Sequence, residues 1–348
     1  MRPLPAALAL FLPLAACSDG REPLVIYSPH GKEMLEYYEE AFEERHPDVD
    51  VQWLDMGSQQ AYDRVATERE NPQASLWWGA PQTLFQQAAD EGLLAPYVPT
   101  WSESVERTAR DDSSRWYGTF LTPEVIAFNT DAVPENARPT DWDDLLESPL
   151  AGRLLVRSPL ESGTMRTIFG AMILRQPSVE EGYRWLARLD QATRGYASDP
   201  TQLYLKLARG EGDATPWNLP DIYLQAEDVG YPFGYVIPQS GTPVLVDGIA
   251  LVAGAPAEAR AREFYEFVTS AEALAEQAQR FHRIPARTDV AQDQLPPWMR
   301  GLDLRPMDLD WARLGAEGPT WMQHWDERIR GRGADYLAEL DAALEVAP

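Results

Sequence analysis

Cysteine and lysine are nearly absent from this chain of 348 residues. Cys17 is the only cysteine, and Lys32 and Lys206 are the only lysines. A lone cysteine has no partner for an intramolecular disulfide, so the stability of the fold must come from burial of a core. The net charge of −25 argues against nucleic acid as a partner, because such binding depends on neutralising phosphates with cations.

Sequence signatures of catalysis are missing as well. The chain has no Gly-x-Ser-x-Gly elbow, no His-Glu-x-x-His, no Walker loop and no dinucleotide-binding fingerprint. We therefore expect no enzyme and no cofactor. Because acidic residues are abundant, a secreted hydrolase that uses a pair of carboxylates stays open as an alternative.

The N-terminus carries an export signal. The apolar run from Ala6 to Pro13 is too short to span a bilayer but long enough for the core of a signal peptide. The tetrapeptide Leu14-Ala15-Ala16-Cys17 follows and resembles the lipobox of bacterial lipoproteins. The resemblance implies that residues 1–16 are a signal peptide that is removed, that Cys17 is lipidated and that residues 17–22 are a tether. The protein would then be exported to the periplasm or cell surface and anchored to a membrane.

Two blocks of alternating strands and helices follow, and the 44% of hydrophobic residues is typical of a packed globular protein. The first block has strands over 24–27, 49–54 and 74–78, with helices after each. The second has a strand over 154–156 and helices over 164–174, 179–189 and 202–208. Extended segments over 116–129 and 234–252 join the blocks, and the chain after 257 is helical apart from a Pro-rich stretch. This pattern predicts an α/β protein of two lobes with a hinge.

Four segments carry a resemblance to bacterial extracellular solute-binding proteins of ABC importers. The branch is the iron, phosphonate and sugar-phosphate type, with the type II periplasmic binding fold. The resemblance covers roughly residues 23–290. The segments are Val25–His30, Leu76–Pro81, Gly210–Asp213 and Gly234–Pro238, the last continuing as Gly241–Val252.

The resemblance implies an interlobe ligand cleft and a partnership with an ABC permease and its ATPase. Lobe 1 would comprise residues 23–118 and about 247–290, and lobe 2 residues 119–246 and about 291–348. Iron-binding members place adjacent tyrosines shortly after the Gly-Glu-x-Asp segment, whereas this chain has Trp217-Asn218-Leu219-Pro220-Asp221 there. The histidines also lack metal-ligand spacing. We therefore predict no metal site, with a ferric-iron receptor as an alternative.

Three predicted helix starts suit an anionic ligand, because the first turn of a helix offers free N–H groups and a positive dipole end. Each start taken alone is better explained as an ordinary N-cap, and only the fold that the resemblance implies, in which strand-to-helix turns line the cleft, brings the two explanations level. Arg166 follows the third start and is either an anion-binding side chain or a surface arginine. The starts are Ser28-Pro29-His30-Gly31, Gly57-Ser58-Gln59 and Ser162-Gly163-Thr164.

Aromatic and polar residues complete the predicted site. Strand alternation turns the rings of Trp77 and Trp78 to opposite faces, and we expect Trp78, beside Gly79, to face the cleft. Burial of both rings in the core is the alternative. The resemblance places Trp217, Asn218 and Asp221 in the cleft, and a turn around Pro216 and Pro220 is the alternative there. Asp247, in the extended segment, is expected to be structural.

Together these features predict a monomeric lipoprotein receptor that binds a small-molecule ligand by closing its lobes around it. The ligand is expected to be a small organic anion, phosphorylated or phosphonate-like. A receptor that presents its ligand to a sensor kinase would have the same fold, and that alternative stays open.

Overall fold

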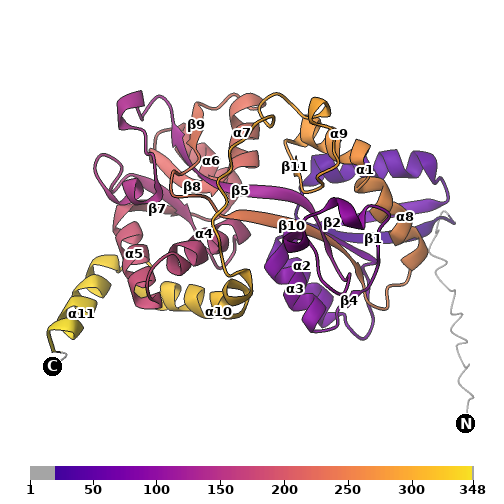
Figure 1. Ribbon diagram of the computed structural model, residues 1–348, viewed down its shortest axis with the longest axis horizontal. Helices are drawn as coiled ribbons and strands as arrows, with labels where there is room; N and C mark the ends of the chain where they lie inside the picture. The colour runs from indigo at the N-terminus through magenta and orange to yellow at the C-terminus, as the bar shows by residue number, and fades with distance from the viewer. Residues whose placement is uncertain (1–19, 347–348) are drawn as a thin grey trace, which may run out of the picture.

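The computed structural model describes residues 20–346, which form two α/β halves connected by long strands (Figure 1). Cys17 and the predicted signal peptide lie outside the described residues, so the lipid anchor stays a prediction. One continuous sheet runs through both halves in the order β2-β1-β3-β10-β5-β8-β6-β7.

The first half contains the parallel strands that the N-terminal pattern predicts. In β3 all six residues are buried, because helices cover both faces of the sheet. Helix α1 follows β1 and buries Met34, Leu35, Tyr38 and Phe42, which are the residues whose spacing predicts the helix. The elements are β1 (Glu22–Ser28), α1 (Lys32–Arg45), β2 (Val49–Asp55), α2 (Ser58–Thr67), β3 (Leu76–Pro81), α3 (Gln82–Asp90), β4 (Leu94–Ala95), α8 (Glu258–Val268) and α9 (Ala271–Phe281).

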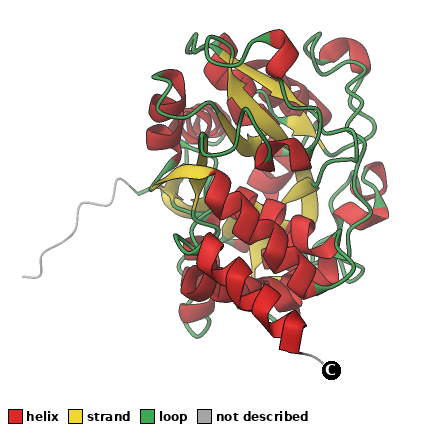
Figure 2. Cartoon of the chain, turned by 90° about the vertical axis from the view of Figure 1, so that its left-hand side faces the viewer, coloured by secondary structure: helices red, strands yellow, loops and turns green. Residues whose placement is uncertain are grey.

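The second half is built on a smaller mixed sheet with helices on both sides. Figure 2 views this half from its outer end and shows helices in front of the strands. The elements are β6 (Leu154–Arg157), α4 (Gly163–Leu174), α5 (Val179–Ala192), β7 (Thr193–Ala197), α6 (Pro200–Ala208), β8 (Ala214–Asn218), α7 (Leu219–Glu227), β9 (Phe233–Val236), α10 (Trp311–His324) and α11 (Gly333–Val346).

Two antiparallel strands connect the halves, namely β5 (Tyr117–Asn129) and β10 (Val244–Val252). The first part of β5 pairs with β10 from Tyr117 to Pro123, and its second part pairs with β8 and β9. A third connection follows β11 (Ile284–Pro285), which pairs with β5 and leads toward α10. Backbone hydrogen bonds join this segment to Thr242, which donates to Arg305 at 2.9 Å and accepts from Met307 at 2.8 Å.

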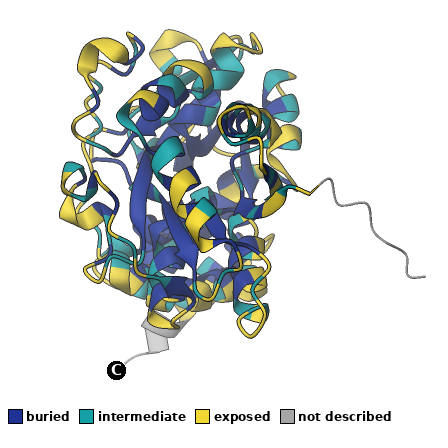
Figure 3. Ribbon diagram, turned by 90° about the vertical axis from the view of Figure 1, so that its right-hand side faces the viewer, coloured by how far each residue is buried: buried dark blue, intermediate teal, exposed yellow. Residues whose placement is uncertain are grey.

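Three hydrophobic clusters form the interior, one in the second half and two on opposite faces of the sheet in the first. Figure 3 shows the buried residues concentrated on the strands and the exposed ones on outer helices and loops. Leu295 and Met299 pack in a cluster of the first half, whereas α11 packs on the second, and α10 packs on α4 of the second half and also contacts α3 of the first. The lobe boundaries given above stay a prediction. No helix within residues 20–346 is long and apolar enough to cross a membrane.

The expected order of strands and helices agrees with the observed one over most of the chain, with boundaries within a few residues. The expectation misses β7, β8 and α7. The segment around Pro216 and Pro220 is strand β8 followed by helix α7, in which Pro220 lies in the first turn, where a missing N–H costs nothing.

Candidate ligand-binding site

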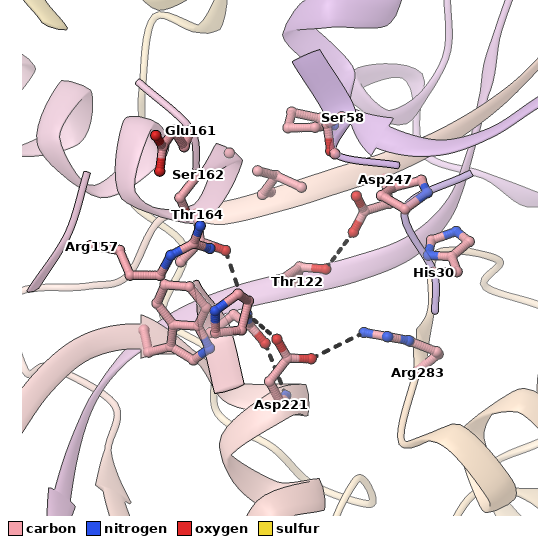
Figure 4. Close-up of a pocket in the computed structure, with 18 residues that line it drawn as sticks. His30, Ser58, Thr122, Arg157, Glu161, Ser162, Thr164, Asp221, Asp247 and Arg283 are labelled. Atoms are coloured by element: carbon pink, nitrogen blue, oxygen red, sulfur yellow. Dashed lines mark hydrogen bonds and ion pairs between the residues drawn. The ribbon is translucent and has the colours of Figure 1, made fainter. Parts of the chain in front are cut away.

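A cavity of about 250 Å³ lies between the two halves (Figure 4). Its volume is at the small end of ligand sites, which suits a compact molecule. The first half contributes the turns after β1 and β2, the second contributes the starts of α4, α6 and α7, and β5 and β10 supply Thr122 and Asp247. The lining residues are Pro29, His30, Gly57, Ser58, Pro81, Thr122, Arg157, Glu161, Ser162, Gly163, Thr164, Pro200, Trp217, Asn218, Asp221, Leu245, Asp247 and Arg283.

Helices α2 and α4 begin on this cavity, one from each half. Ser162 caps α4, and its hydroxyl accepts a hydrogen bond from the N–H of Met165 at 3.3 Å. The N–H groups at the start of a helix have no partner within it, and they point outward with the positive end of the dipole. A Cβ on Gly163 would lie 3.0 Å from Pro81 of the opposite half, so glycine permits the close approach of the two halves here.

Arg157 is a buried cation that forms no ion pair within the described part of the chain, although the charge of Glu161 acts on it from a distance. It is the last residue of β6, only 9% exposed, and it donates a hydrogen bond to the carbonyl of Ser198 at 3.3 Å. Its guanidinium lies 5.6 Å from the ring centroid of Trp217, and its Nε has no hydrogen-bond partner among the described residues. Burial lowers the pKa of Arg157. An arginine starts from so high a pKa that it remains charged, and its side chain lines the cavity.

Carboxylates line the cavity as well. Asp247 accepts a hydrogen bond from the hydroxyl of Thr122 at 2.6 Å. Burial raises its pKa to about 6, although the Thr122 hydroxyl and the positive charge of Arg283 act in the opposite direction. Asp221 accepts from the Asn218 amide at 2.9 Å and lies 3.6 Å from the Arg283 guanidinium.

His30 forms part of the wall as a neutral ring. It lies edge-on to Trp78 and Phe120, with ring centroids 5.2 Å away in both cases. Burial, helped by the charge of Arg283, lowers the pKa of His30 well below its ordinary value. A neutral imidazole can exchange hydrogen bonds with a ligand but adds no positive charge for an anion.

Most residues predicted for the site come together on this cavity, and whether they bind a ligand stays a prediction. Four of the predicted residues do not line it. Ser28 is buried behind His30, whose N–H donates to the Ser28 hydroxyl at 3.2 Å, and Gly79 lies against the His30 ring. The predicted residues on the cavity are His30, Gly57, Ser58, Ser162, Gly163, Thr164, Trp217, Asn218 and Asp221.

The expectation that Trp78 faces the cleft is wrong. Trp78 is 0% exposed and packs against Tyr38 and Phe264, while Trp77 is equally buried against Phe85 on the other face of the sheet. The two rings do alternate, but helices cover both faces, so both belong to the core.

Arg166 also differs from expectation, because it lies behind the cavity wall. Its guanidinium donates to the side-chain oxygen of Gln59, on α2 of the opposite half, at 2.8 Å. It donates further to the carbonyls of Pro159 and Leu160. Arg166 therefore joins the two halves in this structure and does not face the ligand space.

Sequence reasoning missed Arg157, Thr122 and Arg283, and it assigned Asp247 a structural role only. Arg157 had a usable signal, since it directly follows the predicted strand over 154–156, and the carboxyl ends of parallel strands are the usual place for ligand groups in α/β proteins. Thr122, Asp247 and Arg283 reach the cavity through tertiary contacts between distant segments, for which the sequence offers no local signal.

Metal ligands are not grouped at this site. Within the described part of the chain, no cluster of three or more His, Cys, Asp or Glu side chains is arranged to hold a metal ion. Trp217 and Asn218 line the cavity, and neither supplies an anionic oxygen for a hard cation.

Curated relatives of this chain are named as binding proteins. A relative named as a probable ABC transporter periplasmic-binding protein, y4fP of Sinorhizobium fredii, is 23% identical over 93% of this chain and 91% of its own length. A periplasmic protein of Salmonella typhimurium named for binding 2-aminoethylphosphonate is 24% identical over 82% of this chain and 81% of its own.

Solved structures share the fold over nearly their whole length. The periplasmic binding protein AfuA from Actinobacillus pleuropneumoniae, solved with fructose-6-phosphate bound, superposes with a TM-score of 0.77 at 24% identity, covering 90% of this chain and 99% of that one. Ferric-binding proteins also share the fold, with TM-scores of 0.76 at 20% and 21% identity. These likenesses establish the two-lobed type II periplasmic binding fold, as the sequence predicts.

The family profile of the bacterial extracellular solute-binding proteins matches residues 38–300. That span contains both connecting strands and the whole cavity lining except His30 and Pro29. The chain therefore belongs to the bacterial extracellular solute-binding protein family, and it is a solute-binding protein of the ABC-transporter type and not an enzyme.

Proposed function

We propose that this protein is an exported, lipid-anchored receptor that captures a small organic anion, phosphorylated or phosphonate-like, and delivers it to an ABC permease with its ATPase. The ligand binds between the lobes, which close around it, and the protein acts as a monomer. The observation that carries the proposal is Arg157, a buried cation that lines the cavity, forms no ion pair with a carboxylate among the described residues and has an Nε without a hydrogen-bond partner among them. A buried charge without a partner is costly, so an anionic ligand is its natural counterion.

The helix starts support the same class of ligand. Ser58 opens α2 in one half, and Gly163 and Thr164 open α4 in the other, so an oxyanion between them meets N–H groups from both sides. Such a ligand links the two halves and thereby favours the closed form, since only that form provides both sets of donors. The names of the phosphonate-binding relative and of the fructose-6-phosphate complex are consistent with this chemistry.

The ferric-binding alternative has less support. Ferric ion requires several hard anionic oxygens, and the described residues present no cluster of three or more candidate ligands. The cavity instead places Arg157 and two helix N-termini where a cation would be repelled.

Binding measurements on Arg157→Gln test the proposal. The unmodified protein is titrated by calorimetry with short alkylphosphonates, sugar phosphates and ferric citrate. We expect a phosphonate or phosphate ester to bind and its affinity to fall at least about tenfold in the variant, the loss typical of a charge-assisted contact. Arg194→Gln, at an exposed arginine of β7, is the matched control and should bind as the unmodified protein does. Unchanged anion affinity in Arg157→Gln, or binding of ferric ion alone, contradicts the proposal.

A further inference from the structure

Asp247 lies close to the two helix starts that suit an anion. It lines the cavity and pairs in the sheet with Pro81, and a Cβ on Gly163, at the start of α4, would lie only 3.0 Å from Pro81. Figure 4 draws Asp247 and Ser58 on one side of the cavity and Thr164 on the other. An oxyanion held between the starts of α2 and α4 therefore meets the carboxyl group of Asp247 as well.

One oxygen of Asp247 is open to a ligand. Oδ2 accepts a hydrogen bond from the Thr122 hydroxyl at 2.6 Å, whereas Oδ1 has no hydrogen-bond partner among the described residues. An ionised carboxylate can only accept hydrogen bonds, and the same holds for a fully ionised oxyanion. The two repel one another, most strongly in a cavity from which water is excluded. Their contact is favourable only as an O–H···O hydrogen bond, with a proton on one of the two groups.

The surroundings of Asp247 favour its protonated form. Burial raises its pKa to about 6, although the Thr122 hydroxyl and the positive charge of Arg283 act in the opposite direction, and Asp221 of α7 adds a negative charge. Glu124, on the same face of β5 as Thr122, contributes no charge, because burial, followed by the charges of Asp247 and Asp221, raises its pKa well above the ordinary value. The His30 ring is neutral too. An anion placed beside Asp247 adds to this effect, since a nearby like charge disfavours the ionised form.

We propose that Asp247 determines specificity by sharing one proton with the bound anion, so that the cavity selects oxyanions that can retain a proton near neutral pH over sulfonates and sulfates. This inference rests on the proposed function, which places the anion between the starts of α2 and α4. A monoanionic phosphonate supplies the proton, and its P–OH group donates to Oδ1. A dianion instead accepts from protonated Asp247, so that its capture takes up one proton from water. A sulfonate holds no proton near neutral pH and binds only when Asp247 is itself protonated.

Two probes of nearly the same shape, ethylphosphonate and ethanesulfonate, test the proposal by calorimetric titration of the unmodified protein across neutral pH. The affinity for ethanesulfonate should fall about tenfold for each pH unit above about 6, where Asp247 ionises. The affinity for ethylphosphonate should persist until the probe loses its own second proton, and only then fall. Parallel falls of both affinities above pH 6 would mean that Asp247 acts by its charge alone, which overturns the shared proton. An affinity for ethylphosphonate that rises as the probe becomes a dianion overturns it as well.

The Asp247→Asn variant locates the proton. Its amide keeps an acceptor for Thr122 and offers N–H donors at every pH, so the variant should bind ethanesulfonate without the fall above pH 6 and lose most of the preference for ethylphosphonate. Asp131→Asn, the same substitution at an exposed residue outside the cavity lining, is the matched control and should keep the preference.

Persistence of the preference in Asp247→Asn contradicts the role of Asp247. If that variant folds poorly, the two pH profiles of the unmodified protein decide the proposal. Equal binding of both probes at every pH overturns the shared proton and leaves anion capture standing, whereas a failure of both probes to bind overturns the proposed function together with this inference.

Discussion

At the scale of single residues, Gly79 determines how His30 is presented to the cavity. Its φ of +94° lies in a region that side chains disfavour, and a Cβ there would lie 2.5 Å from Nε2 of His30. Gly79→Ala should therefore lower the free energy of unfolding by about 3 kcal/mol, from backbone strain and displacement of the ring together. Urea denaturation measures this loss.

Gly92→Ala is the matched control for that substitution. Gly92 also has a positive φ, +73°, but nothing lies within 4 Å of a Cβ built there. Its replacement should cost about 1 kcal/mol, from backbone strain alone. Equal losses in the two variants would mean that the His30 ring moves aside without cost.

Asp247 links stability to pH. Its carboxyl titrates near 6 in the folded protein, against an ordinary value of 3.8, so the folded state retains the proton to higher pH than the unfolded state does. The free energy of unfolding therefore falls as pH rises from about 4 to about 6, and the loss is complete above that window. Asp247→Asn lacks this titration and should gain on the order of 2 kcal/mol relative to the unmodified protein between pH 4 and pH 7. Urea denaturation across that range measures the difference, and a constant difference contradicts the assignment.

At the scale of elements, α4 and α5 form a natural pair for separating stability from binding. Ser162 caps α4 at the cavity, and Ser178 caps α5 with a similar bond to the N–H of Glu181 at 3.2 Å, away from the cavity lining. Ser162→Ala and Ser178→Ala should each lower the free energy of unfolding by about 1 kcal/mol. Only Ser162→Ala should also weaken phosphonate binding, because it frays the turn whose N–H groups face the ligand. If both variants changed phosphonate binding equally, the start of α4 would not be a contact of the ligand.

The elements also show what local sequence can and cannot predict. The spacing of four apolar residues predicts helix α1 directly, because residues three and four apart lie on the same face of a helix and here form its buried face. These residues are Met34, Leu35, Tyr38 and Phe42. The sequence does not predict strand β8, because it contains Pro216 and proline is rare within strands. In the structure Pro216 nevertheless pairs with Ile126 of β5. The expectation that Trp78 faces the cleft fails for a related reason. Alternation fixes which face a ring points to, but whether helices cover that face depends on tertiary packing.

At the scale of the whole molecule, the fold was predictable because two α/β blocks and two extended connections leave few alternatives. The site was predictable only in part. Glycine and hydroxyl residues mark helix starts in the sequence, so Ser58, Gly163 and Thr164 could be predicted as cavity residues. By contrast, Asp247 and Arg283 become neighbours of Asp221 only when the connecting strands bring the halves together. The charged residues that line the cavity thus come from segments far apart in the sequence.

The predicted location of the protein at a membrane depends on Cys17, near the N-terminus. Arg21 forms ion pairs with Glu43 at 2.7 Å and Asp50 at 2.8 Å, so the packed body includes a residue only four positions after Cys17 in the sequence. If Cys17 is lipidated, the intervening residues span at most about 15 Å, which holds the body beside the membrane and its permease. The net charge of −25 opposes adsorption to anionic headgroups.

Cys17→Ser should therefore move the protein from the membrane fraction to the soluble fraction of cells. Ser18→Ala, which leaves the thiol in place, is the control and should remain membrane-bound. Fractionation after an alkaline carbonate wash, together with incorporation of labelled palmitate, measures both the location and the lipid. The body should fold and bind phosphonate equally well in the two variants, because the anchor lies outside the cavity and the core. Membrane retention of Cys17→Ser would mean that some other contact, such as a stable complex with the permease, holds the receptor in place.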